Sequence, residues 1–364
     1  MRAAVTVSAL LLCSTVSAFV IPFRLAAVSN VTAGGDVLEQ HTQSYFVANV
    51  TVGTPPQLFT VIIDTASSDF WLPDSTCTTC TGKRLFNSQS SSSYQKNGRS
   101  FMSNNHFGVT EGFLGMDTLV LAGAIIIPKT DIGQVIEMPA AVTALNGVDG
   151  VLGLAFPSLS SDYPAQPPFI RGVTQGDIAQ SVFSIWLEEQ MQTSDNGTHG
   201  VIYYGGYDLV HCHANRSFVQ LSRAGLFQFT LSNFYINGFG AARRIQSTII
   251  SSSPYIKVPS SAFLRILDSL DLPSDTPLPA QVDCNTTLVL GFDIGNNTPL
   301  IVTQRNLFLP DEDGNCTLAV MPTNADGFDM GQVIELGIPF LRGRCVYFDT
   351  GLQRVGVADA IAHD

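Results

Sequence analysis

The stretch Asp64-Thr65-Ala66-Ser67-Ser68 is the most informative part of this chain of 364 residues. It follows the apolar run Phe-Thr-Val-Ile-Ile at 59–63 and precedes Phe-Trp-Leu-Pro at 70–73. Short runs rich in β-branched and aromatic residues, bounded by small polar residues, are typical of strands joined by tight loops. We therefore expect Asp64 to lie in a loop between two strands.

A weak internal repeat accompanies this loop. Asp64 is followed by Gly153 in the sequence Val-Leu-Gly-Leu, and Ile250 is followed, after nearly the same number of positions, by Gly337 in Glu-Leu-Gly-Ile. A duplicated all-β lobe, each copy placing one loop against one apolar strand that contains glycine, would produce this pattern. Two-fold symmetry would then place Asp64 and Ile250 face to face.

Five motifs occur in the order found in pepsin-like aspartic peptidases, and the chain resembles that family over about residues 44–360. The resemblance implies an all-β, bilobal acid protease fold, with two related six-stranded-type β-barrel lobes and a cleft between them. The matching segments are the opening strand at 45–46 and 52–57, the first active loop at 64–73, the second arm of the flap hairpin at 112–118, the strand behind the first loop at 149–157, and its C-terminal counterpart at 336–342.

The resemblance implies catalysis by two carboxylates, and this chain lacks the second. In such a pair, one carboxylate accepts a proton from the attacking water and the other donates to the scissile carbonyl, with one shared proton coupling them. Here the second position is Ile250, in Ser-Thr-Ile-Ile-Ser-Ser-Ser at 247–253. Because acid–base catalysis contributes roughly 10²–10⁴-fold per group, we expect Asp64 to be a catalytic remnant and the protein to be inactive or severely impaired.

Further departures support this prediction. The flap position usually held by Tyr falls on Asn105, and Ala66 replaces the Gly of the first loop. Ile338 replaces an Asp that in the family often follows the apolar residue and glycine found here as Leu336-Gly337. We assign substrate or ligand contacts to Ser67, Asn105 and Phe107. Asp64 could equally be a structural acceptor of loop N–H groups.

A literal Asp349-Thr350-Gly351 does not supply the missing carboxylate. It lies beyond Gly337, and only thirteen residues follow it, too few for another lobe. We interpret it as a hairpin turn, with Gly351 at the position of positive φ.

The chain divides into four segments in this interpretation: a signal peptide at 1–18, a short arm or residual prosegment at 19–43, an N-terminal lobe at 44–208 and a C-terminal lobe at 209–364. The signal is indicated by Arg2, an apolar run and small residues ending at Ala18. Family zymogens usually carry a longer basic prosegment, whereas Arg24 is the only base in this arm. Apolar spacing predicts helices at 181–191 and 260–270.

Six cysteines remain once Cys13 is removed with the signal, which indicates three disulfides in a secreted chain. Cys77 and Cys80 have the spacing of a redox motif but do not open a helix, which favours a structural disulfide. The family resemblance suggests that Cys284 pairs with Cys316, which leaves Cys212 for Cys345. His211-Cys212-His213 lacks a completing ligand, so we expect no metal. Glycosylation sequons occur at Asn30, Asn49, Asn196, Asn215, Asn285, Asn296 and Asn315.

The net charge of −12, with only four lysines, disfavours nucleic acid and anionic membranes as partners. We expect a secreted, extracellular monomer, or one in an acidic lumen, without cofactors. Its predicted function is to bind a peptide or protein in the interlobe cleft, as a pseudoprotease. Two alternatives remain: an aspartic-type endopeptidase that carries out proteolysis at acidic pH, for example by pairing two Asp64 loops in a homodimer, and a decoy or inhibitor of peptidases.

Overall fold

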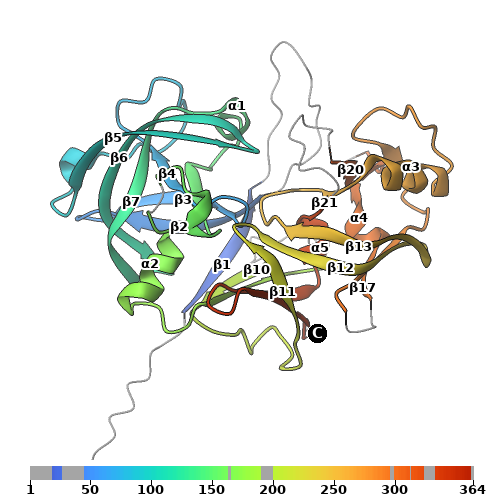
Figure 1. Ribbon diagram of the computed structural model, residues 1–364. Coiled ribbons are helices and arrows are strands. Elements are labelled where there is room, and N and C mark those ends of the chain that lie inside the picture. The colour runs from blue at the N-terminus through green and yellow to red at the C-terminus, as the bar shows by residue number, and fades with distance from the viewer. Residues whose placement is uncertain are drawn as a thin grey trace, which may run out of the picture.

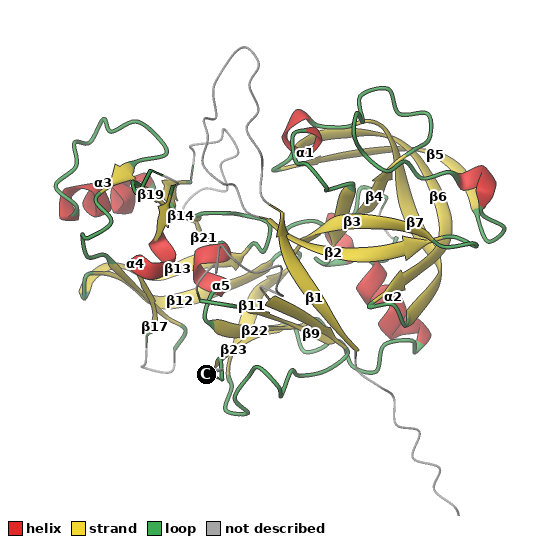
Figure 2. Cartoon of the chain, turned by 180° about the vertical axis from the view of Figure 1, so that it is seen from behind, coloured by secondary structure: helices red, strands yellow, loops and turns green. Residues whose placement is uncertain are grey.

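The computed structural model describes residues 19–26, 45–162, 165–189, 200–295, 299–311, 313–323 and 333–361. Strands dominate, and the elements form two lobes that meet above a shared sheet (Figure 1). The same arrangement seen from behind shows β1 running along the junction of the lobes (Figure 2). This is the all-β bilobal architecture predicted from the sequence.

The first lobe contains seven strands and four short helical segments among the described residues. Strands β2 and β3 form an antiparallel hairpin, β8 pairs in parallel with β3, and β5 and β6 form a long hairpin that we call the flap hairpin. The elements are β2 (Tyr45–Val52), β3 (Gln57–Asp64), β4 (Phe70–Pro73), η1 (Ser88–Ser90), β5 (Gln95–Asn105), β6 (Gly108–Leu121), β7 (Ile125–Glu137), α1 (Ala140–Thr143), β8 (Gly150–Gly153), η2 (Pro157–Leu159) and α2 (Pro168–Gln175).

The second lobe repeats part of this plan. Strands β12 and β13 are antiparallel, and β21 pairs in parallel with β13 as β8 does with β3. The elements are β12 (Phe227–Ile236), β13 (Phe239–Ile249), β14 (Ile256–Val258), α3 (Ser260–Ser269), β15 (Gln281–Val282), β16 (Val289–Asp293), β17 (Leu300–Thr303), α4 (Gln304–Leu307), β18 (Phe308–Pro310), β19 (Cys316–Leu318), β20 (Val320–Pro322), β21 (Val333–Leu336) and α5 (Ile338–Leu341).

A six-stranded antiparallel sheet joins the two lobes. Its order is β1, β10, β9, β22, β23 and β11, so three strands from residues 19–204 lie beside three strands from residues 217–359. The far end of β1 also pairs with β2 of the first lobe. The strands are β1 (Phe19–Ala26), β9 (Val182–Leu187), β10 (Gly200–Tyr204), β11 (Ser217–Ala224), β22 (Arg344–Asp349) and β23 (Arg354–Asp359).

One helix predicted from the sequence is wrong and the other is confirmed. Residues 182–187 form strand β9, which pairs with β10 on one side and β22 on the other and whose six residues are all buried. A continuous apolar run fits a doubly buried strand as well as a helix, and the packing of the central sheet decides between them. The helix expected at 260–270 is α3, which buries Ala262, Phe263, Ile266 and Leu267.

The Asp349 segment is a turn between β22 and β23, as expected, but the role given to Gly351 is wrong. The left-handed residue of this turn is Gln353, with φ of 51°. Gly351 is instead required by close packing, because a Cβ there would lie 2.1 Å from Ser181 Oγ. The Asp349 carboxylate accepts hydrogen bonds from Leu352 N and Arg354 Nε, both at 2.8 Å.

Candidate functional site

Asp64 is placed by the end of β3, opposite Gly153 of β8. Its side chain is fully buried. A Cβ added to Gly153 would lie 2.6 Å from the main-chain atoms Asp69 N and Ser68 C. Glycine at this position therefore lets the loop that carries Asp64 fold tightly back onto β8.

The second lobe builds the same support around Ile250. Ile249 pairs with Leu336, and Ile250 N donates to Leu336 O at 3.0 Å. A Cβ added to Gly337 would lie 2.2 Å from Tyr255 O. Each lobe thus holds one loop against a glycine at the end of an apolar strand, Gly153 as the last residue of β8 and Gly337 directly after β21.

Four of the hydrogen bonds that join these two loops involve the hydroxyls of Thr65 and Ser251. Thr65 Oγ1 donates to Ile249 O at 2.8 Å, and Ser251 Oγ donates to Ile63 O at 2.7 Å. The backbone N–H of Ser251 donates to Thr65 Oγ1 at 3.0 Å, and that of Thr65 donates to Ser251 Oγ at 3.1 Å. The pattern is reciprocal, because each hydroxyl donates to one carbonyl and accepts one N–H of the other loop.

This reciprocity defines which residues correspond. If Thr65 corresponds to Ser251, then the residues before them, Asp64 and Ile250, occupy equivalent positions, as do Ala66 and Ser252 after them. Ile250 is buried, with 4% of its surface exposed. Within the described part of the chain, no second carboxylate is hydrogen-bonded to Asp64.

The hydrogen bonds of Asp64 are unevenly distributed over its two oxygens. Oδ1 accepts from Ala66 N at 2.8 Å and from Ser252 Oγ at 2.7 Å. Oδ2 is buried and has no hydrogen-bond partner among the described residues. Asp64 therefore accepts a loop N–H, as a structural role requires, and keeps one oxygen for another donor.

The flap hairpin reaches this carboxylate through His106. Its two-residue loop, His106 and Phe107, closes on the pair Asn105 and Gly108. His106 Nε2 lies 2.9 Å from Ser252 Oγ. The Ser252 hydroxyl donates its one hydrogen bond to Asp64 Oδ1, so His106 Nε2 must carry a proton and donate to Ser252 Oγ.

We call Asp64, Ile250, Ser252 and His106 the interlobe site. The sequence prediction did not assign His106 or Ser252 a role, although both lie in stretches that were compared with the family. The sequence signal that could have identified His106 is a histidine in the turn of the predicted flap hairpin. Its partner lies 146 positions away, and no local pattern connects the two.

The residues predicted to contact a ligand lie near this site in different environments. Ser67 is buried, and its Oγ has no partner among the described residues. Asn105 Oδ1 accepts from Phe107 N at 2.9 Å, while its Nδ2 is buried without a partner in the described part of the chain. Phe107 is buried with its ring 6.1 Å from that of Tyr45. Burial and the nearby Tyr255 raise the pKa of Tyr45 to about 12, so its phenol stays neutral.

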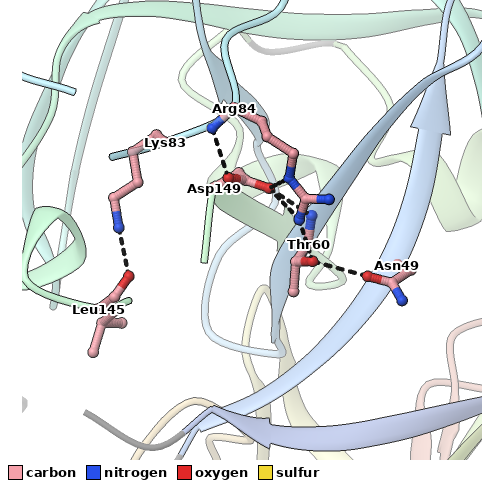
Figure 3. Close-up of polar contacts among 6 residues, drawn as sticks. All are labelled: Asn49, Thr60, Lys83, Arg84, Leu145 and Asp149. Atoms are coloured by element: carbon pink, nitrogen blue, oxygen red, sulfur yellow. Dashed lines mark hydrogen bonds and ion pairs between the residues drawn. The ribbon is translucent and has the colours of Figure 1, made fainter. Parts of the chain in front are cut away.

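A polar cluster behind the first loop fixes β3 and β8 relative to each other (Figure 3). Asp149, directly before β8, accepts from Thr60 N of β3 at 2.8 Å and from Arg84 N at 2.9 Å. Arg84 Nε also pairs with this carboxylate at 2.7 Å, and Thr60 Oγ1 donates to Asn49 at 2.8 Å. A buried carboxylate with several donors holds its neighbours in one register.

Three disulfides join cysteines in the described part of the chain. They join Cys77 to Cys80, Cys212 to Cys345 and Cys284 to Cys316.

Among the sequon asparagines, Asn49, Asn215, Asn285 and Asn315 are exposed, whereas Asn30, Asn196 and Asn296 lie outside the described residues. No cluster of three metal-binding side chains occurs in the described ranges. None of the helices described is long and apolar enough to cross a membrane.

Comparison with known proteins agrees with the fold and with the order of the loops. The family model of the eukaryotic aspartyl proteases matches residues 44–360. The chain belongs to this family. Aspartic protease 17 of Caenorhabditis elegans is 30% identical over 337 residues, covering 89% of this chain and 85% of that protein.

Other aspartyl proteases match over similar lengths. Aspartic protease 6 of Caenorhabditis elegans is 31% identical over 323 residues, covering 87% of this chain and 82% of that protein. Renin of Canis lupus familiaris is 29% identical over 338 residues, covering 88% and 81%. The family relationship therefore extends through both lobes.

Proposed function

We propose that this aspartyl protease family member binds an extended peptide between its lobes and has lost hydrolysis by a carboxylate pair. The observation that supports the proposal is the reciprocal bonding of Thr65 and Ser251, which makes Ile250 the counterpart of Asp64. An isoleucine can neither hold a proton nor accept one. Asp64 therefore lacks the partner with which it would share a proton in catalysis.

Peptide binding does not depend on the missing carboxylate. An extended segment can be held by main-chain groups and by pockets for alternate side chains. The interlobe site offers Asp64 Oδ2, and its neighbours Ser67 and Asn105 each have a buried polar atom without a partner among the described residues. Buried polar groups cost free energy until they are paired, so a peptide that supplies partners gains affinity there.

Secretion is part of the same proposal. The first 18 residues have the pattern of a secretory signal. Disulfides persist mainly in oxidising compartments, and six cysteines are joined in three disulfides. We further propose that the exposed asparagines Asn49, Asn215, Asn285 and Asn315 carry glycans.

The test combines binding with hydrolysis. The purified glycosylated protein should enrich peptides from a random nine-residue phage library. It should also show no pepstatin-sensitive cleavage of a denatured protein across about pH 2–6, the range in which a carboxylate pair shares one proton. Ala66→Trp, which puts a bulky side chain two residues after Asp64 where the Ala66 N–H bonds its carboxylate, should abolish peptide binding. Ala179→Trp, at an exposed alanine beside β9, is the matched control and should bind normally.

Two results would overturn the proposal. Absence of enriched peptides from every selection would contradict peptide binding. Acid proteolysis that is lost in Asp64→Asn would show that Asp64 has a functional partner, and the endopeptidase alternative would then replace the proposal.

A further inference from the structure

The interlobe site contains a buried carboxyl group whose hydrogen bonding is incomplete. Asp64 is completely buried, and no cation lies within ion-pair distance of it among the described residues. Two hydrogen bonds reach Oδ1, and none reaches Oδ2 within the described ranges. Removing a carboxylate from water is costly unless donors or a cation replace the lost solvation.

Ile250 determines what kind of group can supply that compensation. A second carboxylate opposite Asp64 would need to share a proton with it. Ile250 instead places a buried apolar side chain at the equivalent position of the second loop, so no like charge stands there. An apolar surrounding strengthens the attraction of a lone carboxylate for a cationic donor.

His106 is the donor that the protein itself provides. It acts from the flap hairpin through Ser252, whose hydroxyl relays the hydrogen bond to Asp64 Oδ1. It therefore reaches only the oxygen that already has two donors. Because His106 contacts Ser252, which itself bonds Asp64, a ligand that approaches Asp64 from the flap side competes with His106.

We propose that Asp64 forms a specificity site for a basic side chain of the bound peptide, and that His106 is its intramolecular competitor. A lysine or arginine of the peptide donates to Asp64 Oδ2 and displaces His106 from Ser252. Ile250 packs against the aliphatic part of that side chain, as long basic side chains commonly bury their stems. This inference rests on the proposed peptide binding.

The first experiment reads the specificity directly. Random nine-residue peptides displayed on phage are selected at neutral pH on the wild-type protein, on Asp64→Asn and on His106→Ala. Wild-type and His106→Ala selections should enrich lysine or arginine at one position of the aligned peptides. The Asp64→Asn selection should lose this enrichment.

A second experiment measures how much the positive charge of the peptide side chain contributes to its affinity. A selected peptide is synthesised with lysine and with norleucine, which has a side chain of similar length without the ammonium group. The lysine peptide should bind wild-type protein roughly 10–100-fold more tightly, as hydrogen bonds to charged groups allow. This comparison needs no variant protein, so it decides the question even if Asp64→Asn does not fold.

A variant of the flap hairpin tests whether His106 competes with the peptide. His106→Ala should tighten binding of the lysine peptide roughly tenfold, because the ligand no longer has to displace an existing donor. Asn104→Ala, at an exposed residue of the same hairpin, is the matched control and should leave affinity unchanged.

The outcomes separate this inference from the proposed function. Enriched peptides without a basic position, a basic preference that persists in Asp64→Asn, or equal affinity for lysine and norleucine peptides would overturn the specificity site while peptide binding stands. Unchanged affinity in His106→Ala would overturn the role of the competitor. Failure of every selection would contradict peptide binding itself.

Discussion

The two loops at the centre of the molecule have the same backbone support and opposite chemistry. Each follows a strand, packs against a glycine and exchanges hydrogen bonds with the other through a hydroxyl side chain. The first loop presents the carboxylate of Asp64, and the second presents the hydrocarbon of Ile250. The support and the catalytic group are therefore separate requirements.

Stability explains why the support can persist without the chemistry. The hydroxyls of Thr65 and Ser251 are buried and satisfy main-chain groups of both lobes, so their loss would leave buried polar groups unpaired. The second catalytic carboxylate would contribute nothing comparable, because two buried carboxylates repel each other. An isoleucine at this position is therefore compatible with the fold, because the hydrogen bonds that support both loops do not involve its side chain.

The largest expected effect comes from giving the second loop a carboxylate and restoring the family's residues at three positions around it. Ile250→Asp combined with Ala66→Gly, Ser252→Gly and Asn105→Tyr should give pepstatin-sensitive hydrolysis at acidic pH at least roughly 10²-fold above wild type, since it restores an acid–base partner. Ile250→Asp alone should give less, because Ser252 still binds Asp64 Oδ1 and His106. Cleavage of a denatured protein measures the gain.

The control carries the three companion changes with Ile250 retained, and it should stay inactive. Equal activity in this control would show that the flap and loop residues, rather than Ile250, prevent hydrolysis.

The next effect concerns the glycines on which both loops rest. Gly153→Ala and Gly337→Ala should each lower the free energy of unfolding by about 3 kcal/mol, because the added methyl group meets main-chain atoms that cannot move aside cheaply. Urea denaturation measures both. The matched control is Gly240→Ala, where a Cβ has nothing within 4 Å; it should change the free energy by less than about 0.5 kcal/mol. Tolerance of alanine at only one of the two supporting positions would break the equivalence of the loops.

The two loops and the strands that support them could be predicted from the sequence, because their sequence signals are local or repeated. The apolar-Gly segments and the spacing from each loop mark both copies, and family resemblance orders them. Position within the chain was also enough to recognise the segment at Asp349 as a turn. Its detailed conformation was not predictable, because the need for glycine at 351 comes from the distant Ser181.

The missed features depend on contacts between distant segments. Residues 182–187 became a strand because neighbours on both sides supply hydrogen bonds, which an apolar run does not reveal. His106 gained its place from the closure of the flap hairpin onto the other lobe. The absence of the second carboxylate can be read at position 250, whereas the donor that reaches Asp64 in its place requires the folded molecule.

The smallest expected effect tests whether the two loops form one cooperative unit. Thr65→Val removes the donor to Ile249 O and the acceptor of Ser251 N, and Ser251→Ala removes the reciprocal pair. Each should lower the free energy of unfolding by about 1–3 kcal/mol, because buried main-chain groups lose their partners. Ser92→Ala, at an exposed hydroxyl that donates to Thr54 O, is the control and should cost less than about 0.5 kcal/mol.

The double variant Thr65→Val with Ser251→Ala should lower the free energy of unfolding by less than the sum of the single variants, since the first change already disrupts the network that the second removes. Costs that add fully in urea denaturation would mean that the hydroxyls act independently, and the correspondence of Asp64 with Ile250 would then describe geometry without a shared energetic unit.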